Sequence, residues 1–522
     1  SGLDLSNVEK LEVDENNETF VSKNNCVFSR SLDSDGDRSL YLGCKTSIIP
    51  DSTNEGYERI FITDSAFWPF RIESIHIPDS VTAISGEMIN PNYLKTLTVD
   101  SNNKKYNDAG GKNVLVNTKN KKLWVTNQTC YIPDDASICT SIAGWVFLRV
   151  SVETITIPDN ITSIDAKYNF WNCPNLTTIK LGSGLTTLTI NVGSFYGSTK
   201  LKNIDVSNNK YFKFENGILS RYVETKETYT DSDKLVAYFY FGDSDTFTLD
   251  DKYSQIGQYA FHNNKTIKNV VLPSVSSFTI STYAFYGSSL ENINLENCSS
   301  WNNYSFANCK NLKTIKVGTE LNYSVTNVFK DSIIEKVILP QNILLGYSGY
   351  GALYNCLVKD LEFYLGTATS ERYTKDGNQI LDANGTKLCF IIGDEKNIIV
   401  NENVTQIDNL KLYNRNYTSV IFPQNLTQIG NLNGATGIKK FDMPTLKVIR
   451  NGGFMQTDLE EIILYEGMTS IQNSSFYGSK LKSLTIPKSV NYLGTYLLSY
   501  TPCTYLELKN KSLVFKTDTL GS

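Results

Sequence analysis

The chain has 522 residues, of which 40% are hydrophobic and 20% are charged, and its formal net charge is −5. These proportions exclude an intrinsically disordered chain and are typical of a folded protein. The small net charge and the lack of a Lys/Arg block give no indication of nucleic acid, and we expect no nucleic-acid partner.

The N-terminal end carries no targeting signal. It begins Ser1-Gly2-Leu3 and shows no signal peptide. We expect that an N-terminal segment missing from this sequence targets the protein for export and carries its membrane anchor, if it has one. No apolar run approaches the roughly 18 residues that span a bilayer, so we expect that this segment is not an integral membrane protein.

The first predicted element is a β-hairpin near residues 13–50. An Asn-rich turn leads to Val27-Phe28, and a second apolar stretch follows at 40–42. The linking residues 33–37, Asp-Ser-Asp-Gly-Asp, have hairpin-turn chemistry. They faintly resemble a calcium loop, but the Gly and the acidic residue that such a loop needs at its sixth and twelfth positions are missing, and we favour a solvated hairpin tip.

The next element is a strand phrase that returns, with drift, about a dozen times. Residues 72–84 read Ile-Glu-Ser-Ile-His-Ile-Pro-Asp-Ser-Val-Thr-Ala-Ile, and related phrases stand at 152–164 and 481–490. Alternation of apolar and polar residues at the end of the phrase predicts a half-buried strand. The Pro that follows ends the ladder, because it has no N–H to donate.

Three more hairpin inserts with the same order of features are predicted along the chain. They lie near 99–133, 206–250 and 363–400. Each has an aromatic residue, a short apolar stretch and then a second apolar stretch. We predict that each insert caps or decorates one coil of a single continuous solenoid spanning residues 1–522.

A small residue followed by Phe marks each coil between these inserts. Examples are Ala260-Phe261, Ala284-Phe285, Ser305-Phe306 and Ser475-Phe476. Where copies adjoin, the aromatic or Leu positions recur every 21 to 24 residues. This period predicts a β-rich repeat solenoid of irregular leucine-rich repeats, forming a curved right-handed coil with β-hairpin inserts.

Residues suited to catalysis or metal binding are scarce. His76 and His262 are the only two histidines, and the ten cysteines show no Cys-x-x-Cys pair. The cysteines are expected to be small buried hydrophobes, although disulfides such as Cys26–Cys44 stay open. Adjacent Glu460 and Glu461 would point to opposite faces of a strand and cannot act on one bond. We therefore predict no enzyme, no catalytic residue, no metal site and no cofactor.

These residues carry a family resemblance. The order Ala-Phe-x-x-Cys-x-x-Leu, then Leu-x-x-Ile-x-Ile-Pro-x-x-Val-x-x-Ile, resembles the BspA-type leucine-rich repeats of bacterial surface proteins. The inserts are similar to the hairpin segment of that family, with Asn103-Lys-Lys-Tyr106 and Asn216-Gly-Ile-Leu219 as matches. The resemblance covers about residues 8 to 514 and departs most between about 343 and 416. It implies a secreted or cell-surface protein that adheres to host proteins, matrix or other cells.

The positions between the buried residues of each strand are the predicted binding face, because they should point outward. Several later positions hold isoleucine, which a merely solvated sheet would not need, so they form either a binding strip or a patch covered by an insert. The candidate residues are His76, Lys180, Asn292, Asn294, Lys316, Lys336, Ile338, Ile421, Lys440, Ile463 and Tyr505.

The expected function is therefore that of a non-enzymatic, extracellular or cell-surface binding protein. Its partner would be an extracellular protein or glycan, bound along an extended solenoid surface. The alternative is a carbohydrate-recognition or scaffold module of a bacterial surface polysaccharide-handling system. Exposed Trp and Tyr pairs would favour that alternative, because aromatic faces stack on sugar rings.

Overall fold

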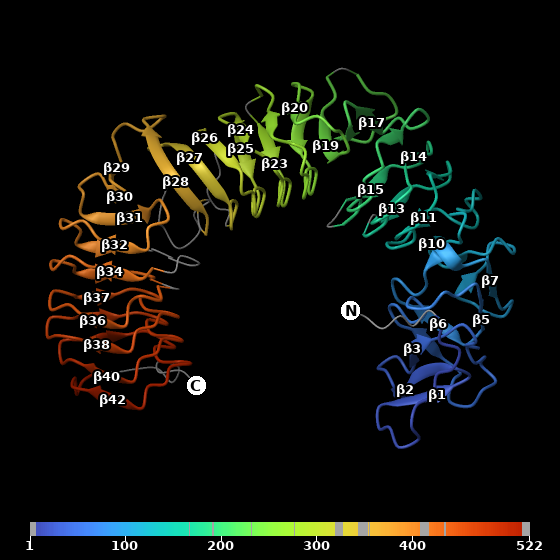
Figure 1. Cartoon of the computed structure of the whole chain (residues 1–522), viewed down its shortest axis with the longest axis horizontal. Helices are drawn as coiled ribbons and strands as arrows, with labels where there is room; N and C mark the ends of the chain where they lie inside the picture. The colour runs from blue at the N-terminus through green and yellow to red at the C-terminus, as the bar shows by residue number, and fades with distance from the viewer. Residues whose placement is uncertain are drawn as a thin grey trace. The chain divides into compact units, whose positions relative to one another are not determined.

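The computed structural model describes residues 7–165, 167–190, 193–230, 232–275, 277–318, 327–342, 353, 355–407, 417–432 and 435–513. Contacts between residues divide the chain into two compact units, Ser1–Asp243 (unit 1) and Ser244–Ser522 (unit 2). Across the described residues the chain forms a β-solenoid of about 20 turns, and its one helical element is the 3-10 turn η1 (Pro91–Tyr93) (Figure 1). The predicted repeat solenoid is confirmed.

The strand phrase forms a series of separate parallel sheets, which we together call the first ladder. Its strands in unit 1 are β5 (Ser74–Ile77), β7 (Thr96–Val99), β12 (Thr154–Thr156), β14 (Thr178–Lys180) and β16 (Asn203–Asp205). Its strands in unit 2 are β20 (Thr246–Thr248), β22 (Asn269–Val271), β24 (Asn292–Leu295), β26 (Leu312–Val317), β27 (Ile333–Pro340), β28 (Leu357–Tyr364), β32 (Asn397–Ile399), β34 (Ser419–Ile421), β36 (Lys440–Asp442), β38 (Glu461–Ile463), β40 (Ser483–Ile486) and β42 (Tyr505–Leu508). Ile155, Ile179 and Ile204 face one another in register and are buried, as the strand pattern predicts.

A second strand in most coils adds a feature that the repeat did not predict. The strand phrase predicts one strand, but a second strand follows it in most coils, and these strands form a second series of parallel sheets, which we call the second ladder. In unit 1 it contains β4 (Ile60–Ile62), β6 (Val81–Ile84), β11 (Ser141–Ile142), β13 (Ser163–Asp165) and β15 (Thr187–Thr189). In unit 2 it contains β21 (Tyr253–Ile256), β23 (Phe278–Ile280), β25 (Cys298–Trp301), β33 (Gln406–Ile407), β35 (Gln428–Ile429), β37 (Val448–Ile449), β39 (Ser470–Ile471) and β41 (Tyr492–Leu493).

The four insert segments each hold three antiparallel strands. They are β1 (Phe20–Lys23), β2 (Cys26–Leu32) and β3 (Arg38–Gly43); β8 (Tyr106–Asn107), β9 (Leu115–Asn117) and β10 (Lys122–Val125); β17 (Phe212–Glu215), β18 (Ile218–Tyr222) and β19 (Leu235–Tyr240); and β29 (Tyr373–Asp376), β30 (Gln379–Asp382) and β31 (Lys387–Ile391). The third strand of an insert also pairs in parallel with the second ladder, as β3 does with β4 and β31 with β33. The antiparallel strands are therefore continuous with the solenoid.

Stacked phenylalanines fill the space between the ladders. Phe285 is fully buried, and its ring centroid lies 4.9 Å from that of Phe261 and 5.2 Å from that of Phe306. The rings are nearly parallel, with interplanar angles of 10° and 5°. One Phe per coil thus extends the core from coil to coil, which explains the spacing seen in the sequence.

Candidate functional site

The outward positions of the first ladder hold the predicted binding residues. On β5, Ile75 and Ile77 are buried while Ser74 and His76 are exposed, and most other strands alternate in a similar way, although β34 and β42 contain no fully buried residue. All eleven candidate residues lie on strands of this ladder, and none of them is buried. His76 and Lys180 belong to unit 1, and the other nine belong to unit 2.

The register of unit 2 brings five of these residues together. Asn294 on β24 lies opposite Lys316 on β26, which lies opposite Ile338 on β27. In the neighbouring row, Lys336 lies opposite Thr314, and Asn292 donates a 2.7 Å hydrogen bond to the next coil at Asn269. The predicted binding face is thus built of rows that run from strand to strand.

Cross-strand carboxylates neutralise the lysines of this face. Lys336 donates to Glu362 at 2.6 Å, and Lys440 pairs with Glu461 at 2.9 Å. Each hydrogen bond raises the pKa of its lysine above the ordinary value. Lys316 likewise pairs with Glu296, and its Nζ lies 5.6 Å from the ring centroid of Tyr364. These lysines therefore hold neighbouring coils together and are not free cations awaiting an anionic ligand.

Two isoleucines of unit 2 face solvent side by side. Ile421 on β34 is 57% exposed, and its register partner Ile399 on β32 is 69% exposed. Ile338 and Ile463 also stand at predicted outward positions, but both are partly buried and expose a smaller fraction of their surface than Ile399 and Ile421 do. The sequence does not identify Ile399 as an outward residue, because the predicted insert near 363–400 includes it. The structure shows instead that Asn397–Ile399 is a strand of the first ladder.

A groove lies at the carboxyl ends of three first-ladder strands in unit 1. Its volume is about 370 Å³, and Lys180 is one of the residues that line it. Thr156, Lys180 and Asp205 stand in register on β12, β14 and β16 at its wall. The other lining residues come mainly from the turns that follow: Asp134, Ile157, Pro158, Asp159, Asn160, Leu181, Gly182, Ser207 and Asn208.

The groove is rich in hydrogen-bond acceptors. Ser183 donates its backbone N–H to Asp159 at 2.7 Å and lowers the pKa of that carboxyl. Hydrogen bonds from Ser207 lower the pKa of Asp205, with a smaller contribution from Lys180. Three aspartates and one lysine give the lining a formal charge of −2 (three negative charges and one positive). Asn160 adds a buried Oδ1 without a hydrogen-bond partner among the described residues. Such a lining suits hydroxyl or ammonium donors.

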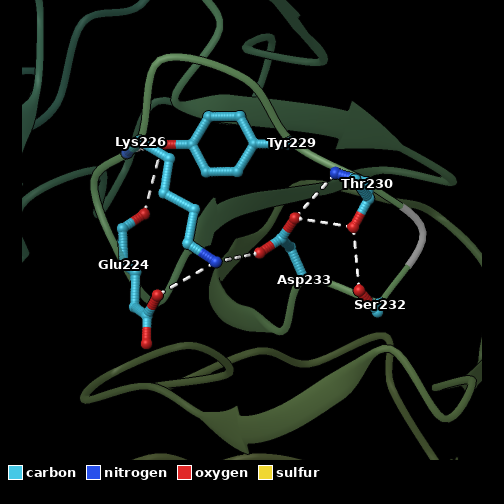
Figure 2. Close-up of polar contacts among 6 residues, drawn as sticks. All are labelled: Glu224, Lys226, Tyr229, Thr230, Ser232 and Asp233. Atoms are coloured by element: carbon cyan, nitrogen blue, oxygen red, sulfur yellow. Dashed lines mark hydrogen bonds and ion pairs between the residues drawn. The ribbon is translucent and has the colours of Figure 1, made fainter.

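The tip of the third insert is a preordered polar loop in unit 1. Figure 2 shows Lys226 between two carboxylates, at 2.5 Å from Asp233 and 3.0 Å from Glu224. Asp233 also accepts from the backbone of Thr230 at 2.6 Å. The hydrogen bond from Lys226 is the main cause that lowers the pKa of Asp233 to about 2. Tyr229 stacks on Tyr222 with ring centroids 3.7 Å apart.

The cysteines are free thiols, and nine of the ten are buried. Cys309 directs its Sγ to the carbonyl of Phe285 at 3.0 Å, and burial raises the pKa of its thiol to about 11. In the described parts of the chain, no group of three or more His, Cys, Asp or Glu residues is placed to hold a metal ion. No described helix is long and apolar enough to cross a membrane.

The fold and its outward strand face define a protein of the leucine-rich repeat class. More narrowly, the chain belongs to the BspA type leucine rich repeat family, whose model matches residues 44–136, 127–222, 236–359 and 431–519. These matches cover well over half of the chain and confirm the resemblance seen in the sequence.

Solved structures of other leucine-rich repeat proteins are similar to this chain. A leucine-rich cell surface protein from Faecalibacterium prausnitzii is 14% identical, with 68% of this chain and 97% of that chain covered and a TM-score of 0.37. A leucine-rich repeat protein from Bacteroides ovatus is 14% identical, with 91% and 99% covered and a TM-score of 0.30. The pneumococcal vaccine antigen PcpA is 12% identical, with 96% and 99% covered and a TM-score of 0.22. A search of curated proteins found no match.

Proposed function

We propose that the protein is a non-catalytic, cell-surface or secreted binding protein that adheres to an extracellular protein through the first ladder of unit 2. The observation that carries this proposal is the solvent-facing pair Ile399 and Ile421, which are 69% and 57% exposed on neighbouring strands. Membership of a repeat family built around extended surfaces supports it.

The exposed pair has no role in the core that would explain it. The register pair Ile398 and Val420 already joins the two strands, since Ile398 is 2% exposed and the partly buried Val420 packs against the core. Covering the two outward isoleucines with an apolar partner surface would remove them from water, at roughly 1.5–3 kcal/mol for each side chain fully buried. Elsewhere on the first ladder of unit 2, Lys336 and Lys440 are already paired with carboxylates.

Binding to a panel of soluble extracellular matrix proteins, measured with the full chain, tests the proposal. The double variant Ile399→Ser/Ile421→Ser should weaken binding by more than about tenfold, because each lost contact removes over 1 kcal/mol. Ile48→Ser is the matched control, since Ile48 is also 69% exposed but lies in the first insert. Equal loss in the control and the double variant, or no loss in the double variant, would overturn this site.

Carbohydrate recognition is a second candidate function, and a separate observation favours it. In unit 1 the half-exposed ring of Trp145 stacks on that of Tyr168, with centroids 4.1 Å apart and an interplanar angle of 20°. Half-exposed aromatic rings of this kind offer flat apolar faces or edges to a pyranose ring. A glycan array probed with the wild-type chain and with Trp145→Ala tests this candidate: signals that depend on Trp145 support it, and an array without signal contradicts it.

A further inference from the structure

Two tryptophans lie against one arginine in unit 1, and a third tryptophan is linked to them through a tyrosine. Trp68, Trp145 and Trp171 are half-exposed. The guanidinium of Arg149 lies 5.1 Å from the ring centroid of Trp171 and 5.9 Å from that of Trp68. Tyr168 lies between Trp145 and Trp171. Its ring centroid is 4.1 Å from that of Trp145 and 5.9 Å from that of Trp171. We call these five residues the aromatic–arginine cluster.

The fold does not require indole rings directly after the core Phe. Trp68 and Trp171 follow Phe67 and Phe170, whereas other coils hold Ala307, Lys330 or Met455 at this place. Trp145 and Tyr168 instead occupy the left-handed position two residues before the core Phe, with φ of 72° and 52°. Aromatic residues are common at that position, since Tyr283 and Tyr304 occupy it in unit 2 with φ of 59° and 61°. The two indole rings that flank Arg149 are therefore the part of the cluster that other coils do without.

The arginine of the cluster packs against ring faces and not against a carboxylate. Arg149 forms no side-chain hydrogen bond or ion pair with a described residue. The same is true of Arg71, whose guanidinium lies over the ring of Tyr93, 5.4 Å from its centroid. Other arginines behave differently, since Arg38 bonds the carbonyl of Gly56 at 2.7 Å and Arg59 pairs with Asp37 at 2.8 Å. Free guanidinium groups can donate pairs of hydrogen bonds to a carboxylate or sulfate.

The backbone that presents Arg149 is fixed from a distant turn. Asn92, the middle residue of η1, donates to the carbonyl of Arg149 at 2.6 Å and accepts from the N–H of Ser151 at 2.9 Å. The backbone N–H of Arg149 in turn donates to the carbonyl of Trp171 at 2.9 Å. This arrangement holds the arginine between two indole rings before any ligand arrives, which lowers the entropy cost of binding.

One partly buried carboxylate lies near this cation. Burial raises the pKa of Glu87 to about 7, while Arg149 opposes and Asp64 reinforces that rise. Near neutral pH, Glu87 is therefore protonated in about half of the molecules and offsets Arg149 only in part. Within the described parts of the chain neither Glu87 nor Asp64 forms an ion pair with Arg149, so that its N–H donors are available to an anion.

We propose that the aromatic–arginine cluster binds an acidic oligosaccharide, a pyranose chain bearing carboxylate or sulfate groups. The aromatic rings stack on the C–H faces of the sugar rings, and Arg149 and Arg71 pair with the acidic groups. An acidic peptide would pair with the arginines but would have no use for three half-exposed indoles. The inference rests on the carbohydrate-recognition candidate above and does not involve the face of Ile399 and Ile421.

Titration calorimetry of the full chain tests the proposal. The probes are a galacturonic acid hexasaccharide, a sulfated heparin hexasaccharide, the carboxyl-reduced form of the first, and a hexaglutamate peptide. We expect binding to at least one acidic hexasaccharide, at least about tenfold weaker binding of the reduced form and of hexaglutamate, and weaker binding at higher salt. Hexaglutamate binding as tightly as the sugars, or no acidic hexasaccharide binding, would overturn the proposal.

Matched variants locate the site. Arg149→Gln and Trp171→Ala should each weaken binding by at least about tenfold, which is the loss of a charge-assisted pair or of one stacked ring. The controls are Arg372→Gln, an exposed arginine of unit 2, and Tyr286→Ala, which follows its core Phe as Trp171 does. The side chain of Arg149 forms no hydrogen bond or ion pair with a described residue, so Arg149→Gln should fold. This variant therefore still tests the site if Trp171→Ala fails to fold. Unchanged affinity in Arg149→Gln would contradict the assignment, while loss of matrix-protein binding alone would leave it standing.

Discussion

At the scale of single residues, each coil depends on a pair of left-handed positions four residues apart. They enclose the small residue and the core Phe, as Tyr283 and Gly287 do around Ala284-Phe285, with φ of 59° and 66°. Asn and Gly recur at the second of these positions because they tolerate positive φ. The sequence pattern predicted the Phe through its size, but the pairing of left-handed residues could not be predicted, since Tyr and Trp at the first position give no signal for positive φ.

Loss of one core Phe tests the stacking of coils. Phe285→Ala should lower the free energy of unfolding by about 3–5 kcal/mol, because a fully buried ring between two others leaves a cavity. Urea unfolding followed by circular dichroism measures the loss. Tyr196→Ala, at a ring that is 55% exposed, serves as the control and should change stability far less. Equal losses in both variants would contradict a core built from the Phe stack.

The stability of the protein should depend on pH through the side chain of His262. Burial, reinforced by Lys265, lowers its pKa to about 4, and its ring stacks on Tyr286 with centroids 5.3 Å apart. The unfolded chain binds the proton first, near pH 6.5, so stability should be full above that pH and should fall as the pH drops toward 4. His262→Gln should flatten the stability curve between pH 7 and 5 relative to wild type. A wild-type slope unchanged in the variant, or an imidazole that titrates near 6.5 by NMR, would contradict the buried neutral ring.

At the scale of elements, the strand phrase and the inserts were predictable for different reasons. Alternation of apolar residues identified β5, β12 and β40 directly, because one face of each is buried. The second ladder was missed, since its strands are often only two or three residues long, as at β11 and β33. Strands that short show no alternation, and their backbone partners come from neighbouring coils about 22 residues away, which a local pattern does not contain.

The insert tip around Lys226 is an element held by side chains rather than by a ladder. Asp233→Asn should remove its ion pair with Lys226 and weaken its bond to the Thr230 N–H, and thereby speed amide exchange in residues 224–230. The melting temperature of the solenoid should stay unchanged, because the tip lies outside the ladders. Hydrogen exchange with mass spectrometry measures the effect, and Ser232→Ala, which loses only a hydroxyl contact, is the control. Unchanged exchange in Asp233→Asn would show that the ion pairs of Figure 2 do not order the loop.

At the scale of the whole molecule, the architecture was predictable and the binding surface only in part. The periodicity of the sequence identified the repeat class, because each coil buries apolar residues at the same positions. The outward residues obey no such repetition. The sequence identified Lys336 and Lys440 as outward positions, but the ion pairs with Glu362 and Glu461 become visible only in the structure. Ile399 and the half-exposed tryptophans emerged only once the register and exposure of each strand and turn were known.

The central claim is that the protein binds through the outward face of the first ladder in unit 2. Hydroxyl-radical footprinting of the full chain, free and bound to a matrix protein that it captures, measures this claim side chain by side chain. The account predicts that oxidation of Ile399 and Ile421 falls on binding while that of Ile48, equally exposed when free, does not change. Unchanged oxidation of Ile399 and Ile421, with protection confined to Tyr229 and the insert tips, would contradict it.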